Sequence, residues 1–197
     1  MHFQKPDKKF CLLLGLAFAA GFLAGLCLVA KGDVISTEKA GLFGDYYLHQ
    51  YSYLDIDRTE LAILVAKERG KWLLLMWALG FSGSGVFFVY LFAGVWGFLE
   101  AIFFAQAFLK KGIAGIGLAV LFGMPQLLIY VPLWIWFLWE VQKQSRICGR
   151  MKRMGTVNQN NRQYLLRLVA AGVGLLLGIL TESYVNSWMI QQVLRMI

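Results

Sequence analysis

The chain has 197 residues, of which 59% are hydrophobic and 15% are charged, and its net charge is +8 at pH 7. A soluble domain of this length needs more polar surface than this composition offers, so the composition predicts an integral membrane protein. The length leaves no room for a separate soluble catalytic domain. We therefore predict one all-α membrane domain over residues 1–197, a polytopic helical bundle with about five transmembrane segments.

The first apolar segment, residues 10–30, is predicted to be a retained membrane helix. The residues before Cys27 come near a lipoprotein cleavage site, but the match fails because the bulky Leu26 occupies a position that needs a small residue. Gly21 and Gly25 have the GxxxG spacing that lets a neighbouring helix approach closely. Glycine is also common in membrane helices generally, so both interpretations of this spacing stay open.

Residues 31–60 form an acidic loop that we expect outside the membrane as an extracellular amphipathic segment, since six acidic residues outnumber three basic ones. Within it, Asp45, Tyr46, Tyr47 and Tyr51 lie close together in the sequence. Tyrosine suits the membrane interface, where the ring is half buried and the hydroxyl meets water. The same residues could also dock an extracellular partner, and the sequence does not decide between the two.

The second segment, residues 61–81, has four charged residues between positions 67 and 71 and only a short apolar run after them. Long basic side chains can extend to the interface. Either the segment tilts with its charged half outside the hydrocarbon, or it belongs to a hairpin that does not fully cross. A Gly/Ser turn at residues 82–85 ends it.

The next two segments place polar groups at membrane depth. Residues 85–109 are predicted to span, with Glu100 near the middle, as a functional site or as a structural hydrogen-bond anchor. Residues 112–141 are predicted to contain a broken helix around Gly123–Pro125, because proline is tolerated at the first position of a new helix. Irregular backbone at this depth must be surrounded by protein or line a water-filled cavity.

A basic loop precedes the last segment, residues 165–190, in which Gly174 and Gly178 repeat the GxxxG spacing. The loop contains seven basic residues and no acid, and three more lysines precede the first segment: Lys143, Arg146, Arg150, Lys152, Arg153, Arg162 and Arg167, with Lys5, Lys8 and Lys9. By the positive-inside rule the amino terminus and this loop are cytoplasmic and the carboxyl terminus is outside. Five crossings would put the two termini on opposite sides of the membrane, and so would three crossings plus one hairpin. The charge pattern therefore does not decide between these two topologies. Attraction to anionic lipid headgroups explains the charge better than nucleic-acid binding, so we expect no nucleic-acid partner.

The sequence offers no set of catalytic, metal-binding or cofactor-binding residues. Residues 80–83 match the G-x-S-G motif of intramembrane serine proteases, but no histidine lies on a membrane segment to act as the base. There is no HExxH motif, no P-loop and no dinucleotide-binding fingerprint. We predict that the chain is not an enzyme.

Three motifs occur in a characteristic order: VAKERGKWLLLMWALGF at 65–81 before the Gly/Ser turn, GMPQLLIYVP at 123–132, and ESYVN at 182–186. This order resembles the stage II sporulation protein M family of multispanning bacterial membrane proteins. Ser187 departs from the pattern, since family members often have proline there. The resemblance implies a structural core made of seven residues: Pro125, Gln126, Tyr130, Pro132, Glu182, Tyr184 and Asn186.

The resemblance also implies a non-enzymatic role in the bacterial cell membrane. Family members of the sporulation type act with peptidoglycan hydrolases at the engulfing septum of endospore formers, as the membrane part that localises or regulates them. The alternative is a transporter or channel subunit that uses Glu100 and the broken helix, because discontinuous helices aim their ends at midplane sites in transporters. A cavity shared by Glu100, Gln126 and Glu182 would favour the transporter. The sequence leaves open the partner proteins and whether the chain forms a homo-oligomer.

Overall fold

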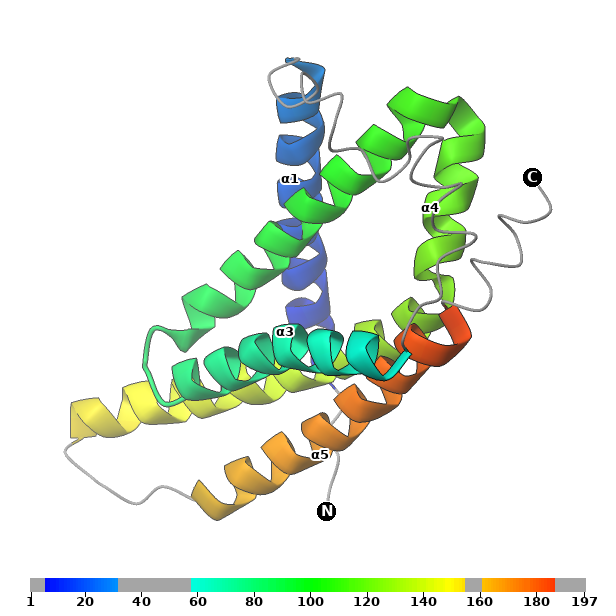
Figure 1. The fold of residues 1–197 in the computed structure, drawn as a ribbon. Helices are drawn as coiled ribbons and strands as arrows, with labels where there is room; N and C mark the ends of the chain where they lie inside the picture. The colour runs from blue at the N-terminus through cyan, green and yellow to red at the C-terminus, as the bar shows by residue number, and fades with distance from the viewer. Residues whose placement is uncertain (1–5, 32–57, 155–160, 187–197) are drawn as a thin grey trace.

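The structure, a computed structural model, describes residues 6–31, 58–154 and 161–186. These residues form α1 (Lys8–Ala30), α3 (Arg58–Leu79), α4 (Gly85–Met154), α5 (Asn161–Leu180) and the π-helix η1 (Thr181–Asn186) (Figure 1). The described residues contain no strand, so the all-α fold class is confirmed. The predicted docking residues Asp45, Tyr46, Tyr47 and Tyr51 lie outside the described ranges.

Three of the described helical stretches are long and apolar enough to cross a membrane: Lys8–Ala30, Gly85–Leu109 and Arg162–Tyr184. Helix length and hydropathy therefore support the prediction, made from the composition, that the chain is a membrane protein. α3, which covers residues 61–79 of the predicted second segment, is not among the three. All of its charged side chains lie between Arg58 and Lys71, and they lower its hydropathy.

The first part of α4 (Gly85–Leu109) runs parallel to α1 and antiparallel to α3. Gly21 of α1 faces Gly94, and Gly25 faces Phe98, so residue numbers rise together along this contact. In α3, Trp72 packs on Phe92 with ring centroids 5.8 Å apart. Arg69, which is nearer the amino terminus of α3, packs on Trp96, which is further along α4, so residue numbers run in opposite directions along this contact. α3 and the first part of α4 are thus the two arms of a helical hairpin around the Gly/Ser turn.

Glycine lets α1 and α4 touch backbone to backbone. A Cβ atom built on Gly21 would lie 1.9 Å from the Gly94 carbonyl oxygen, and one built on Gly97 would lie 2.2 Å from the Phe18 carbonyl oxygen. Any side chain at these positions would separate the helices. The GxxxG spacing of α1 is therefore a helix contact, as small residues are at the interfaces of membrane helices.

α4 contains one residue with non-helical dihedral angles, Gly112, with φ 61° and ψ −141°. This φ lies in the left-handed region, which glycine adopts without a steric cost. Figure 1 shows the ribbon of α4 reversing its direction near its upper end. The predicted break around Gly123–Pro125 is wrong, because the backbone there remains helical and the break falls at Gly112.

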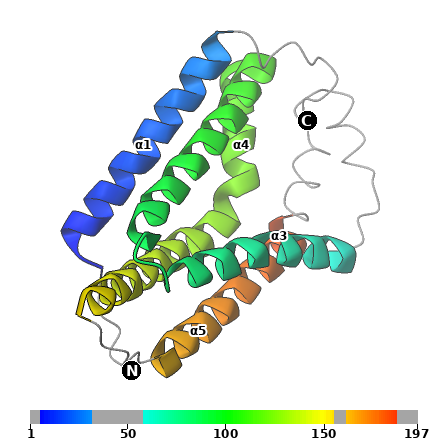
Figure 2. The same ribbon diagram turned by 90° about the vertical axis from the view of Figure 1, so that its left-hand side faces the viewer.

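The prolines bend α4 rather than break it. Both views show the ribbon changing direction a second time between its light green and yellow-green parts, the range that includes Pro125 and Pro132 (Figures 1 and 2). Proline has a φ compatible with a helix, but it removes one backbone hydrogen bond and its ring pushes the preceding turn away. A continuous helix with a bend satisfies these constraints, which explains why no break is needed.

The last part of α4 (residues 125–154) continues beyond the predicted span as far as Met154, so Lys143, Arg146 and Arg150 lie on a helix rather than in a loop. Buried polar side chains hold this extension against the hairpin. Gln142 Nε2 donates a 2.7 Å hydrogen bond to the Tyr90 hydroxyl, and Ser145 Oγ donates a 2.6 Å bond to the Ser82 carbonyl.

The start of α1, the end of α4 and the start of α5, all predicted to be cytoplasmic, lie together on one side of the molecule. Phe10 of α1 packs on Trp139 of α4 with centroids 5.0 Å apart. The Tyr164 hydroxyl of α5 donates a 2.9 Å bond to the Trp77 carbonyl, next to the Gly/Ser turn. Figure 2 shows the start of α1, the end of α4 and the start of α5 on the same side of the bundle.

The glycine contact of α1 can be tested with a matched pair of substitutions. We expect Gly21→Ala to destabilise the protein by about 1–3 kcal/mol, because the added methyl group overpacks a backbone contact. Gly15→Ala, on the same helix, meets nothing within 4 Å and should cause no loss. Unfolding by SDS titration in detergent measures both. Equal stability of the two variants would contradict the contact.

The conformation of Gly112 gives a second prediction. Gly112→Ala should cost about 1–3 kcal/mol, because an L side chain is strained at this positive φ and extended ψ even where space is open. Gly117→Ala is the control, since this helical glycine also has nothing within 4 Å and alanine favours a helix. The same SDS titration applies, and a neutral Gly112→Ala would show that α4 does not reverse there.

Candidate functional site

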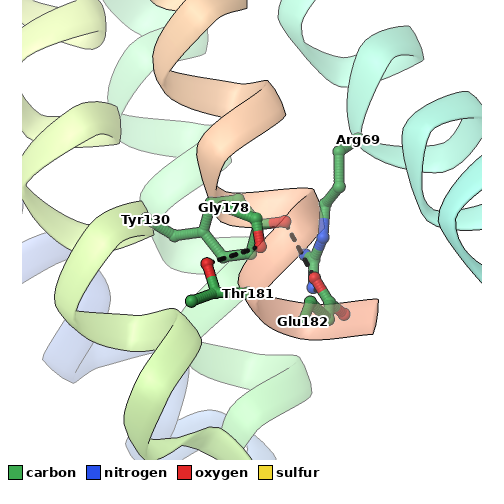
Figure 3. A network of polar contacts seen from close by, with 5 residues as sticks. All are labelled: Arg69, Tyr130, Gly178, Thr181 and Glu182. Carbon is green, nitrogen blue, oxygen red and sulfur yellow. Dashed lines mark hydrogen bonds and ion pairs between the residues drawn. The ribbon is translucent and has the colours of Figure 1, made fainter. Parts of the chain in front are cut away.

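A polar cluster joins α3, α4 and η1 within an otherwise apolar region (Figure 3). Arg69 Nη2 lies 3.5 Å from Glu182 Oε1, and the Tyr130 hydroxyl donates a 2.8 Å hydrogen bond to Glu182 Oε2. The side chains of Arg69 and Glu182 are only 21% and 18% exposed. Both carboxylate oxygens thus have a partner, and hydrogen bonds to a charged group are stronger than those between neutral groups.

Two aromatic rings flank the arginine of this cluster. The Arg69 guanidinium carbon lies 5.0 Å from the centroid of the Trp96 ring and 5.1 Å from that of Tyr130. Such cation–π contacts contribute about 0.5–2 kcal/mol, more where water is excluded. Through Trp96 and Tyr130, Arg69 ties α3 to both the first and the last part of α4.

Tyr130 reaches Glu182 because α5 presents glycine to it. A Cβ atom on Gly178 would lie 2.3 Å from Tyr130 Cε1, and one on Gly174 would lie 2.7 Å from Leu133 Cδ1. A side chain at Gly178 would push the tyrosine ring away from the carboxylate. The second GxxxG spacing is therefore the contact surface of α5 for α4.

Glu182 lies in η1, where the helix widens from α to π geometry. Just before it, the Thr181 hydroxyl lies within hydrogen-bond distance of the Leu177 carbonyl at 2.6 Å and of the Gly178 carbonyl at 3.1 Å. Figure 3 shows the contact with Gly178. A threonine that bonds back to the preceding turn loosens or bends a helix, and π turns recur at functional sites. Because η1 has π geometry, the four-residue spacing of Glu182 and Asn186 does not correspond to one turn of an α-helix.

The structure brings together only some of the predicted site residues. Tyr130 and Glu182 meet, whereas Tyr184 and Pro132 are exposed and outside the cluster. Glu100 is half buried on the first part of α4, within electrostatic reach of Arg69. The side chains of the remaining predicted residues lie outside the described part of the chain: Pro125, Gln126 and Asn186.

Sequence reasoning missed Arg69, which we had treated as one of several cations that reach the interface. One signal was available, since Arg69 is the sole arginine between residues 59 and 145, in a segment whose other cations are lysines. Arginine forms planar pairs with carboxylates and stacks on aromatic rings, whereas lysine acts as a hydrated point charge. A lone arginine beside tryptophans indicated a partner within the protein.

A second charged cluster, also not predicted, fixes the opposite end of α5. Glu140 is 3% exposed and forms ion pairs with Lys143 Nζ at 2.6 Å and with Arg167 Nη1 at 2.5 Å. Lys143 also lies 5.7 Å from the Trp139 ring. The acid pairs with two cations that the sequence assigned to a loop without acids and offsets one of their two positive charges, and it links α4 to α5.

A groove of about 730 Å³ runs between α3 and the first part of α4, beside the arginine cluster. Its walls are aliphatic and aromatic except for Glu68, Arg69 and Glu182. Glu100 is not among the residues that line it, so Glu100 and Glu182 do not share this groove. Across residues 6–31, 58–154 and 161–186, no three His, Cys, Asp or Glu residues gather as metal ligands would.

A scan of protein-family models, a search of curated proteins and a search of solved structures each found no match for this chain.

The cluster predicts a specific loss of stability. Tyr130→Phe removes a hydrogen bond to a charged acceptor and should cost about 1.5–3 kcal/mol. Tyr184→Phe is the matched control, because this tyrosine is 43% exposed and two residues from Glu182, and its effect should stay within about 0.5 kcal/mol. Glu182→Gln combined with Tyr130→Phe should cost less than the sum of the two single variants, since they remove the same bond. Additive effects in the SDS titration would contradict the bond.

Proposed function

We propose that the chain is a non-enzymatic membrane scaffold or regulator, resembling stage II sporulation protein M, that helps localise or activate peptidoglycan hydrolases during engulfment in endospore formation. One observation carries the proposal: each of the three motifs behind the resemblance supplies one member of the polar cluster, Arg69, Tyr130 and Glu182. The motifs lie far apart in the sequence, and a shared contact is a physical reason for them to occur together.

The polar groups of the cluster bond to one another, and this supports a structural role for the cluster. Both oxygens of Glu182 are engaged, and the Arg69 guanidinium lies against two rings. A network whose members satisfy one another gives rigidity and a unique arrangement of helices. A membrane scaffold needs such rigidity, because its loops must present a fixed surface to their partners.

We further propose that the chain crosses the bacterial membrane five times, with the amino terminus in the cytoplasm and the carboxyl terminus outside. The parallel direction of α1 and the first part of α4 supports this topology, because the chain must return across the membrane between two parallel spans. α3 lies between α1 and α4 in the sequence and runs in the opposite direction, so it is placed to make this return. Its charged amino-terminal half would lie toward the outer interface, where basic side chains extend to water.

The alternative, a transporter or channel subunit, has less support. Glu100 does not line the groove that Glu182 lines, and the irregular backbone lies at Gly112, just past the end of the apolar stretch Gly85–Leu109. Transporters of this type place their helix breaks near the bilayer midplane, beside the binding site. We therefore rank the scaffold first.

Crosslinking in cells tests the proposed function. The full chain, affinity-tagged and crosslinked in the organism that encodes it during engulfment, should recover peptidoglycan hydrolases identified by mass spectrometry. A Glu182→Gln bait should recover less of them than a Tyr184→Phe bait at equal amounts in the membrane, because only the former weakens the cluster.

Two results would overturn the scaffold. One is the absence of any wall hydrolase from the crosslinked material together with normal engulfment in a deletion strain. The other is solute or ion flux through vesicles that contain the purified protein, abolished by Glu100→Gln, which would favour the transporter.

A further inference from the structure

The end of the bundle where α1 starts, α4 ends and α5 starts presents a surface rich in exposed cations. Five basic side chains are exposed there: Lys8, Lys9, Arg146, Arg150 and Arg162. They come from three helices, and we call them the basic strip. Packing contacts bring these segments together, including Phe10 on Trp139 and Tyr164 on the Trp77 carbonyl. Figure 2 shows the three segments on one side of the molecule.

The cations of this region fall into two groups, those paired with the buried Glu140 and those of the basic strip. Glu140 is 3% exposed and engages Lys143 and Arg167, so it contributes almost nothing to the surface charge. Lys143 and Arg167 are partly buried and share this one carboxylate, so the three residues together keep a net positive charge. The five cations of the basic strip lie outside this network, and Asp7 is the exposed acid that accompanies them in the described parts of these segments.

The strip also has a fixed geometry. Arg146 and Arg150 are four residues apart on α4, so they project from one face of the helix. α4 is anchored at this level by the bond from Ser145 Oγ to the Ser82 carbonyl and by the close approach of Gly149 to Gly83. The cations are therefore held on helices next to the membrane rather than spread along a loop.

We propose that the basic strip binds the headgroups of anionic phospholipids on one face of the bilayer. Clusters of four to eight basic residues next to membrane helices attract anionic lipids through charge, and the strip has this number and this position. Its location at the ends of two membrane-length helices, α1 and α5, places it at headgroup level. The proposal holds whether the chain is a scaffold or a transporter.

Energy transfer in vesicles tests the site. The full chain is reconstituted into phosphatidylcholine vesicles with a trace of pyrene-labelled phosphatidylglycerol, and transfer from tryptophan to pyrene gives its preference over pyrene-labelled phosphatidylcholine. We expect Arg146→Gln with Arg150→Gln to reduce the preference severalfold, since two of the five cations that attract an anionic headgroup are lost. The control is Lys67→Gln with Lys71→Gln, two exposed lysines of α3 that lie outside the strip, and it should keep the preference.

High salt should weaken the preference of the unaltered protein, because exposed charges are screened. The proposal is overturned if the Arg146/Arg150 variant keeps the preference of the unaltered protein. It is also overturned if the Lys67/Lys71 variant loses as much, since the effect would then come from overall charge. Equal transfer to both labelled lipids in the unaltered protein would show that no anionic headgroup is recognised.

Discussion

The pairing of Glu182 with Arg69 and Tyr130 is the interaction on which the arrangement of the helices depends. A carboxylate and a guanidinium that are shielded from water must be paired, because an isolated buried charge costs several kcal/mol (roughly 3–5 when one partner is removed). This requirement brings α3, the last part of α4 and the end of α5 to one point, although their residues are far apart in the sequence. At the other end of α5 the buried Glu140 is likewise paired, with Lys143 and Arg167.

Glycine makes these pairings sterically possible. Gly178 lets the Tyr130 ring reach the carboxylate, and Gly21 and Gly97 let α1 lie directly on α4. In a membrane, helices gain little from burying apolar side chains against one another, because lipid is equally apolar. Close contact and polar pairing therefore have to hold the bundle together, and this structure uses both.

The two charged regions suggest different tasks within the proposed scaffold. The arginine cluster is internal and fixes the relative positions of the helices, so its loss would alter every surface that the helices carry. The basic strip is external, and its cations are available to the headgroup layer. A rigid bundle anchored at one face of the membrane can hold a partner at a defined depth and orientation.

The sequence by itself indicated the membrane class and the all-helical fold, because hydropathy is a local property of the chain. It placed pairs of glycines at GxxxG spacing in two segments, but whether they contact another helix was decided by the tertiary structure. It also identified Tyr130 and Glu182 as polar residues of interest, although it could not show that they meet. It placed the helix break at Gly123–Pro125, since proline marks both bends and breaks, and only backbone dihedral angles distinguish them.

Only the tertiary structure revealed the importance of Arg69 and Glu140, because a charge in one segment gains its meaning from a partner in another. It also showed that α1 and the first part of α4 lie in direct contact, which no local pattern records. A long apolar run indicates that a helix can cross the membrane, but which helices touch depends on contacts between residues far apart in the chain.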